Sequence, residues 1–233
     1  AARDSRTEVP PLGLLPHRYH RKPPYIYTHG EIGRLLKAAK QLPSRTGLRP
    51  RTYATLLGLL VVTGMRVGEV VGLDREDVDP VNGVLTVRRT KFGKSRLVPV
   101  HVSTQRALNR YADWRDRIQP KPATTSFLLG EHGGRLTVNV VEQTFVKLSH
   151  QVGLGRPSDR RGPRLHDMRH GFAIGTLLRW YRTGIDVERH LPELSTYLGH
   201  AHATDTYWYL SAAPELMRLV VARLEPCRGG RPA

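Results

Sequence analysis

The sequence predicts a mostly α-helical domain with one small antiparallel β-sheet. Two observations predict this fold class. Apolar residues recur at helical spacing behind start signals along most of the chain, and only two short runs, 84–87 and 97–100, have the composition of strands. A chain of 233 residues that is 39% hydrophobic can bury a core without disulfides. Its single cysteine, Cys227, excludes an internal disulfide framework and a cysteine-based zinc site.

The N-terminal segment reads differently from the rest of the chain. Residues 1–27 hold five prolines and few periodic apolar positions, which predicts an extended basic linker. Thr28 and Glu31 then have the spacing of a capping box, so a helix is expected over about 29–42. The folded domain is therefore predicted over 28–233.

Further helices and a hairpin follow. The two strand-like runs flank a turn at residues 91–94, which predicts a β-hairpin with Pro99 at an edge. The nearly all-apolar stretch 52–62 predicts a buried helix. Glycines and prolines predict a loop over 152–164. The expected helices are about 52–62, 65–72, 103–118 and 137–151, with interrupted helix from 166 to about 225.

Charge points to a polyanionic partner. The formal net charge is +17 and the isoelectric point is near 10.7, which favours nucleic acid first and an acidic membrane surface second. Residues 88–121 and 156–182 are basic blocks and 69–79 is an acidic block, which predicts a basic face and an acidic back. If the partner is a nucleic acid such as DNA, the basic side chains expected to contact it are Arg88, Arg89, Lys94, Arg96, Arg160, Arg161 and Arg164.

Four short patterns concentrate side chains that could do chemistry. Taken singly, each has a plain structural interpretation: a surface ion pair, a solvated lysine, a local cap or a core tyrosine. Four of them in one order and at these spacings are a much stronger signal. They are Arg66 and Glu69 after a glycine turn, Lys91 on the hairpin tip, His166 and Arg169 one helical turn apart, and Leu198-Gly199-His200 nine residues before Tyr209.

Together these patterns resemble the catalytic domain of the tyrosine recombinase (phage integrase) family, over roughly residues 28–225. The resemblance implies the DNA breaking-rejoining fold, and a reaction that cuts and rejoins double-stranded DNA through a 3′-phosphotyrosine without metal, nucleotide or other cofactor. By motif, Glu69 is the supporting acid. The implied catalytic residues are Arg66, Lys91, His166, Arg169, His200 and Tyr209.

The resemblance also implies partners and a setting. Family members usually carry a helical core-binding domain before the catalytic domain, so residues 1–27 are expected to be the remnant of a linker behind a missing domain. The run 206–211 followed by Pro214 resembles integrase-like transposases of bacterial mobile elements. A bacterial cytoplasmic, nucleoid-associated protein is implied, with a homo-tetramer on synapsed DNA that assembles through a C-terminal helix. The longest apolar run, 56–62, is too short to span a bilayer.

The residue types suit this chemistry. Two guanidiniums and an imidazole can hold the charge that grows on the phosphate oxygens under attack. The phenol needs a proton acceptor, for which His166 is available, and the leaving 5′ oxygen needs an acid, for which Lys91 on the hairpin is available.

Three tyrosines compete for the role of nucleophile. The nine-residue offset from His200 selects Tyr209. In a helix, Tyr207 and Tyr209 differ by about 200° around the axis, so Tyr207 is expected to pack inward beside Leu198. Tyr197 is expected in the core.

Other functions remain open at this point. A type IB topoisomerase would use the same chemistry for DNA relaxation, and a non-catalytic DNA-binding protein could share the scaffold. A metal-dependent nuclease is disfavoured, because no paired carboxylates accompany the histidines at ligand spacing.

Overall fold

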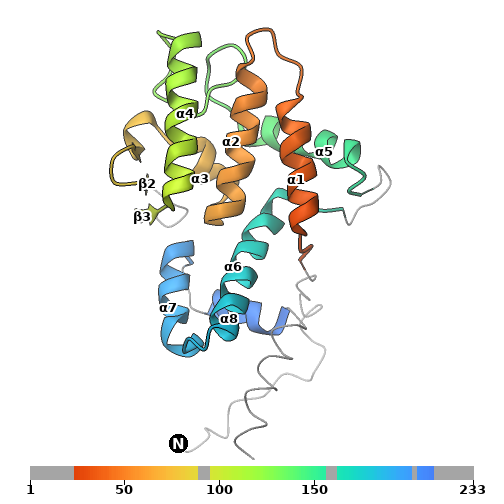
Figure 1. The fold of residues 1–233 in the computed structure, drawn as a ribbon, viewed down its shortest axis with the longest axis vertical. Coiled ribbons are helices and arrows are strands. Elements are labelled where there is room, and N and C mark those ends of the chain that lie inside the picture. Colours follow the sequence, from red (N-terminus) through yellow and green to blue (C-terminus); the bar gives the residue numbers. More distant parts are fainter. Residues whose placement is uncertain (1–23, 89–94, 156–161, 201–203, 213–233) are drawn as a thin grey trace, which may run out of the picture.

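The computed structural model describes residues 24–88, 95–155, 162–200 and 204–212. Within them, helices dominate and three short strands form one antiparallel sheet, which confirms the predicted fold class (Figure 1). The helices are α1 (His29–Lys40), α2 (Leu48–Thr63), α3 (Val67–Gly72), α4 (Val102–Ile118), α5 (Val138–Gln151), α6 (Leu165–Arg182), α7 (Val187–Leu198) and α8 (Thr204–Ala212). A 3-10 turn, η1 (Arg75–Asp77), precedes the strands β1 (Val78–Asp79), β2 (Val84–Val87) and β3 (Arg96–Pro99).

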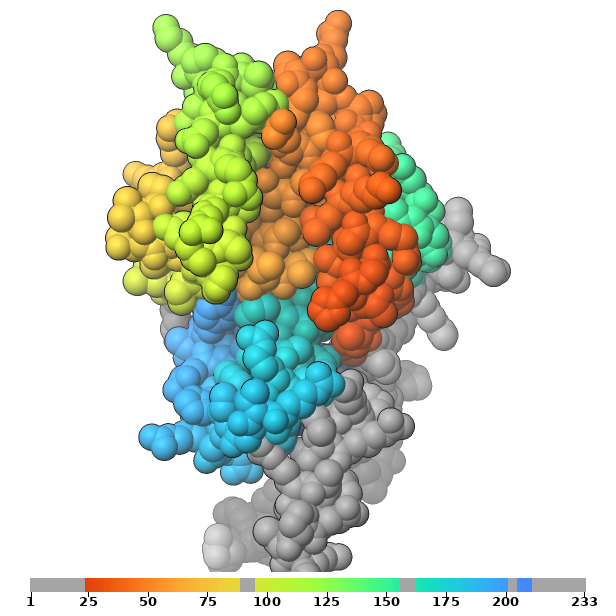
Figure 2. All heavy atoms as spheres, viewed as in Figure 1, coloured from red at the N-terminus to blue at the C-terminus, as the bar shows by residue number. Residues whose placement is uncertain are grey.

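Helix α2 is the centre of the larger core. It lies between α1 and α4 on the face seen in Figure 2 and also contacts α6. This position explains why its sequence is apolar nearly all round; Leu56 and Leu57 are at most 1% exposed. The helix begins at Leu48, earlier than the predicted start near 52. Pro50 lies in the first turn, where its missing N–H would have no helical partner, so it does not break the helix.

The sheet sets the place of Arg96. Strand β2 pairs antiparallel with β3, with Val87 opposite Arg96, so Arg96 lies at the start of β3 across from the last residue of β2. Leu85 and Val98 point into the core and Leu97 is 64% exposed, which gives the alternation of a half-buried sheet. The third strand, β1, has two residues and was not predicted, because so short a run has no readable alternation.

A second core lies between α6, α7 and α8. Its buried side chains include Ile174 and Leu177 from α6 and Leu191 and Leu194 from α7. Helix α6 reaches from this core to α2, so it connects the two halves of the fold (Figure 1). Tyr209 of α8 belongs to this second core and is 2% exposed.

The first helix starts as the sequence predicts. The Glu31 N–H donates to Thr28 Oγ1 at 3.2 Å and the Thr28 N–H donates to Glu31 Oε2 at 2.7 Å, which confirms the capping box. Tyr27, in the segment expected to be linker, is buried, and its hydroxyl donates to the carbonyl of Arg164 at 2.9 Å. The other linker residues up to 23 and the predicted C-terminal helix lie outside the described residues.

Candidate active site

The residues that the resemblance identifies come together where three helix ends meet. Arg66 is the N-cap of α3, His166 and Arg169 lie in the first turns of α6, and His200 follows α7. Tyr209 reaches the same place from α8, with its ring stacked on that of His200 at a centroid distance of 6.1 Å. Lys91 lies outside the described residues.

The C-terminal end of α7 holds three arginines through three consecutive carbonyls. The last carbonyls of a helix have no partner within the helix and form the negative end of its dipole, so they are natural acceptors for guanidinium groups. Arg96 Nε donates to Tyr197 O at 2.8 Å, Arg169 Nη2 donates to Leu198 O at 2.7 Å, and Arg66 Nη2 donates to Gly199 O at 3.2 Å.

Arg169 is fixed from a second side as well. Its Nη1 donates to Gly64 O at 2.8 Å, in the turn that ends α2. Gly64 has a φ of +60°, and a Cβ there would lie 2.7 Å from Cδ1 of Phe172, so this turn requires glycine. Burial and then the charge of Arg66 lower the pKa of Arg169 to about 10, so the group stays cationic at neutral pH.

Glu69 lies between two guanidiniums. Its Oε1 accepts from Arg66 Nη1 at 2.9 Å and from Arg96 Nη1 at 3.0 Å, while its Oε2 accepts from Arg96 Nη2 at 2.8 Å and from the Arg66 N–H at 2.9 Å. The side chains of Glu69 and Arg96 are only 8% and 10% exposed. Burial by itself raises the pKa of Glu69, but the hydrogen bonds and charges of Arg96 and Arg66 bring it below its ordinary value. The pair is therefore part of a buried network and not a surface ion pair.

This network bears on two expectations from the sequence. Arg96 was expected to contact DNA; in this structure its guanidinium is bonded to Glu69 and to Tyr197 O, and it shares Glu69 with Arg66. The acidic block was expected to form an opposite back. Instead Glu69 pairs with Arg96, and Asp77 pairs with Arg88, because the sheet brings the acidic and basic blocks together.

The Leu-Gly-His sequence is a helix terminator with a defined geometry. Gly199 has a φ of +69°, its N–H donates to Thr196 O at 2.9 Å, and the His200 N–H donates to Ser195 O at 3.0 Å. These two bonds define a Schellman motif. A Cβ on Gly199 would lie 2.7 Å from Arg96 Nη1, so glycine also leaves space for the buried guanidinium. The motif directs His200 toward α8, where its Nδ1 lies 2.7 Å from Thr206 Oγ1.

Tyr209 faces this site, and Tyr207 faces away from it. The two tyrosines do lie on different sides of α8, but the buried one is Tyr209, at 2% exposed, and Tyr207 is 50% exposed. The expectation that Tyr207 packs inward was wrong. That expectation assumed that a tyrosine facing the site must also face solvent. The site instead lies in the interface of α6, α7 and α8, so the tyrosine that faces it is buried. Tyr197 is partly buried and stacks on Phe172 with centroids 5.6 Å apart.

Two histidines of α6 lie near the tyrosine. The side chain of His166 is exposed at its surface. The surrounding protein still removes part of its hydration, and this, followed by the charge of Arg169, lowers the pKa of His166. Its ring meets that of His170 edge to face, with centroids 4.7 Å apart. His170 Nδ1 is 3.1 Å from the hydroxyl of Tyr209. Sequence analysis missed His170, although it directly follows Arg169 and lies one helical turn beyond His166.

Two of the other predicted DNA contacts lie on the described surface. The side chains of Arg88 and Arg164 are 54% and 61% exposed, and they pair with Asp77 and Asp167. The remaining predicted contacts, Arg89, Lys94, Arg160 and Arg161, lie outside the described residues.

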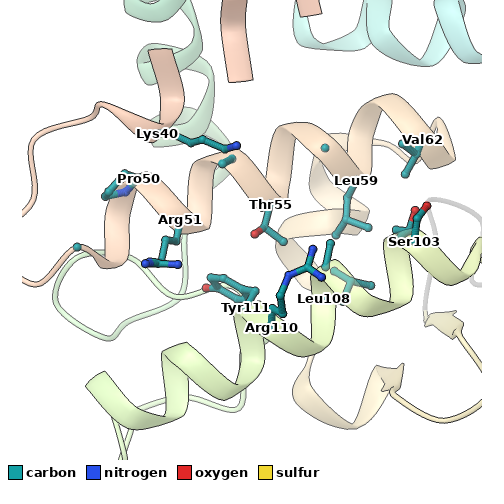
Figure 3. Close-up of a pocket in the computed structure, with 15 residues that line it drawn as sticks. Lys40, Pro50, Arg51, Thr55, Leu59, Val62, Ser103, Leu108, Arg110 and Tyr111 are labelled. Carbon is teal, nitrogen blue, oxygen red and sulfur yellow. The ribbon is translucent and has the colours of Figure 1, made fainter. Parts of the chain in front are cut away.

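The described residues also form a groove between α2 and α4, away from these motifs (Figure 3). Its volume is about 840 Å³, its floor includes Leu59 and Leu108, and its edges carry Lys40, Arg51 and Arg110. None of the residues that line it belongs to the predicted catalytic set.

In the part of the chain that the structure describes, no helix is long and apolar enough to cross a membrane, and no group of His, Cys, Asp or Glu side chains could hold a metal ion.

Comparison with known proteins decides the family. Residues 26–215 match the phage integrase family. The chain belongs to this family. It is a tyrosine-type site-specific recombinase by descent, and its fold and family therefore agree with the resemblance found in the sequence motifs.

The related proteins are integrases and recombinases. A putative integrase/recombinase of Sinorhizobium fredii, y4rB, is 51% identical over 229 residues, which cover 97% of this chain and 73% of the relative. Tyrosine recombinase XerD of Mycobacterium tuberculosis is 34% identical over 209 residues, covering 88% of this chain and 62% of the relative. Among solved structures, XerA recombinase has a TM-score of 0.64 at 23% identity, over 91% of this chain and 68% of its own. The Tn1549 transposon integrase bound to transposon right end DNA has a TM-score of 0.64 at 20% identity, over 88% of this chain and 67% of its own.

Two histidines of the site should make stability depend on pH. Burial is the largest cause that lowers the pKa of both His170 and His200 to about 4, followed by His166 for the first and Arg169 for the second. The unfolded chain binds protons at these residues near pH 6.5 and the folded chain does not until near pH 4, so stability is lost as pH falls through that window. Each histidine lowers the free energy of unfolding by at most about 1.4 kcal/mol for each pH unit within this window.

Urea unfolding at pH 7 and pH 5 measures this loss. The double variant His170→Phe/His200→Phe should show a smaller difference between the two pH values than the wild type. His132→Asn, which changes an exposed histidine, should keep the wild-type difference. Equal stability of the wild-type chain at pH 7 and pH 5 would contradict the lowered pKa values.

Proposed function

We propose that this chain cleaves and rejoins DNA strands at specific sites through a covalent 3′-phosphotyrosine on Tyr209, without metal or nucleotide. The observation that carries the proposal is a cluster of side chains around Tyr209 at the end of α7. The cluster contains Arg66, Arg169, His170, His200 and Tyr209. Storing the phosphodiester as phosphotyrosine conserves the bond energy, so a second 5′-hydroxyl can reverse the step and exchange strands without ATP.

Charge stabilisation is the first part of this mechanism. Attack on a phosphodiester increases the negative charge on its non-bridging oxygens, and fixed donors that are already in place stabilise that charge most effectively. Arg66 is 30% exposed in its side chain and is held by Glu69, so it can offer its guanidinium without losing its orientation. Arg169 supplies a second fixed positive charge, and His166 and His200 supply imidazole groups that are not charged at neutral pH.

Proton transfer and DNA contact complete the mechanism. The phenol of Tyr209 loses its proton as its oxygen bonds to phosphorus, and His166 accepts that proton in our proposal. The leaving 5′ oxygen needs a general acid, and Lys91, between β2 and β3 in the chain, has that role. Arg88 and Arg164, with Arg89, Lys94, Arg160 and Arg161, would contact the DNA backbone and position the duplex. Related structures include a lambda integrase dimer on a core site and a tetramer on a Holliday junction. For this chain we propose a DNA-bound homo-tetramer that assembles through the segment after α8, with residues 1–27 acting as a linker to a DNA-clamping domain.

A topoisomerase-like relaxation is the alternative with the same chemistry. It would produce the same covalent intermediate but no exchange between two DNA molecules. The match to integrases and recombinases over most of the chain favours recombination.

The test is to trap the covalent intermediate. The chain is incubated with a library of duplexes that have a randomised core and a nick near it, so that cleavage releases a short fragment and cannot be reversed. We expect a protein–DNA adduct on denaturing gels that withstands boiling in detergent, and excess EDTA should change its yield by no more than a few-fold. A wild-type chain that binds the library but yields no adduct would disprove the proposal, and loss of the adduct in EDTA with rescue by magnesium would disprove the metal-independent mechanism.

A further inference from the structure

The hydroxyl of Tyr209 lies against an imidazole that the catalytic motifs do not include. His170 Nδ1 is 3.1 Å from Tyr209 Oη, which is a hydrogen-bond distance, and the two ring centroids are 5.5 Å apart. His170 also contacts the ring of Trp208, with centroids 5.4 Å apart. The contact therefore lies inside the interface of α6 and α8, next to the atom that would attack DNA.

We propose that His170 is a positioning residue for the nucleophile: its Nδ1 accepts the hydrogen bond of the Tyr209 hydroxyl and fixes the place of that oxygen. This inference rests on the proposed function, because placing the hydroxyl matters for activity only if Tyr209 attacks DNA. It adds to the motif residues a side chain that acts on the tyrosine and not on the phosphate.

The state of the ring allows this direction of the hydrogen bond. Burial, and then the proximity of His166, lower the pKa of His170 to about 4, so at neutral pH the ring is neutral and one of its nitrogens lacks a proton. A phenol is a good donor to such a nitrogen. With its proton pointing at Nδ1, the oxygen can turn its lone pairs toward a phosphorus atom. A hydroxyl whose proton pointed toward the phosphate would have to rotate before it could attack.

Helix α8 depends on such contacts for its place. It has nine residues, which is too short for a helix to be stable by itself in water. Two imidazole–hydroxyl pairs join it to its neighbours: His170 of α6 with Tyr209, and His200, after α7, with Thr206, which is 0% exposed. Loss of the first bond would leave the ring packing of Tyr209 in the second core, but it would remove the hydrogen bond through which His170 places the hydroxyl.

Nitrogen NMR of the DNA-free chain tests the bond directly. With ¹⁵N-labelled histidine, His170 should appear as a neutral ring with an unprotonated Nδ1, and that resonance should shift in Tyr209→Phe, which removes only the hydroxyl. His190 is the internal control, since its Nδ1 lies 3.0 Å from Glu193 and its ring is 5.8 Å from that of Trp180. Its resonance should not change. A protonated Nδ1 on His170, or a resonance unaffected by Tyr209→Phe, would overturn the proposal.

A pair of variants tests the consequence for activity. Asn and Leu have the same branched shape, but Asn carries polar atoms where His carries Nδ1 and Leu does not. His170→Leu should slow adduct formation on the nicked library by about 100-fold, the effect expected when a reacting group is misplaced by about 1 Å. His170→Asn should stay within a few-fold of wild type, and His190→Leu and His190→Asn should both match wild type.

The outcomes separate this proposal from the proposed function. If the wild-type chain forms no adduct, the proposed function is disproved, and the NMR experiment alone decides whether His170 accepts the hydrogen bond of Tyr209. A wild-type chain that forms the adduct while His170→Leu and His170→Asn are equally slow would overturn positioning by hydrogen bond, because only the ring would then matter. Wild-type rates in both variants would overturn it as well. If His170→Leu does not fold, the comparison of wild type with His170→Asn and the NMR shift in Tyr209→Phe still decide.

Discussion

Tyr209→Phe should abolish the covalent adduct while the chain still folds and binds DNA. The change removes one oxygen from a ring that is 2% exposed, so the packing of α8 on α6 and α7 stays largely as it is. The hydrogen bond to His170 is lost, which costs about 1 kcal/mol of stability. Without the phenolic oxygen no bond to phosphorus can form, so no adduct should be seen at any reaction time. The measurements are a denaturing gel for the adduct, a mobility shift for DNA binding and thermal unfolding for the fold.

Tyr207→Phe is the matched control for this prediction. Tyr207 lies on the same helix, two residues away, and is 50% exposed on the opposite side. The variant removes a phenolic oxygen from the same helix but away from the site, so it should form the adduct at the wild-type rate. Peptide mapping of the trapped wild-type adduct should place the nucleotide on Tyr209. A nucleotide on Tyr207 would show that α8 presents a different face to DNA.

Local signals explain what the sequence could predict about this site. Gly64 and Gly199 end helices in left-handed conformations; His200 directly follows Gly199, and Arg66 follows Gly64 by two residues. Such turns depend on residues that are neighbours in the chain, so they can be read without knowledge of the fold. The same holds for the capping box at Thr28 and for the spacing of His166 and Arg169 on one helix face.

Contacts between distant segments explain what the sequence could not predict. The role of Arg96 depends on the Tyr197 carbonyl at the end of α7, about a hundred residues away, and no local pattern encodes that contact. The direction in which Tyr207 points depends on where α8 packs, and the partner of the Tyr209 hydroxyl depends on the approach of α6. The chain alone predicted that the two tyrosines lie on different sides of α8, but not which of them is buried or what it contacts.

Glu69→Ala should be strongly destabilising and should also impair cleavage. Glu69 is the shared acceptor of Arg66 and Arg96, and the Arg96 side chain is only 10% exposed. Removing one partner from a buried ionic network leaves the other charge without compensation, which costs about 3 to 5 kcal/mol. The free energy of unfolding in urea should fall by about that amount, toward its lower end because Arg66 is 30% exposed and can reach water. Glu76→Ala is the control, since Glu76 is 74% exposed and pairs with Arg88, and it should change stability by less than about 1 kcal/mol.

A double variant separates the role of Glu69 in stability from its role in the site. Replacing Glu69 by Leu and Arg96 by Met together removes the buried pair and fills its space with apolar atoms, and such replacements often cost little stability. The double variant should therefore be more stable than Glu69→Ala, with a coupling between the two positions of at least about 1 kcal/mol. Its cleavage should stay slow at a temperature where it is fully folded, because Arg66 has lost the carboxylate that orients it against Gly199. If the double variant recovers both stability and cleavage, Glu69 serves only to neutralise Arg96. If it recovers stability alone, the carboxylate holds Arg66, the first catalytic arginine of our proposal, in place.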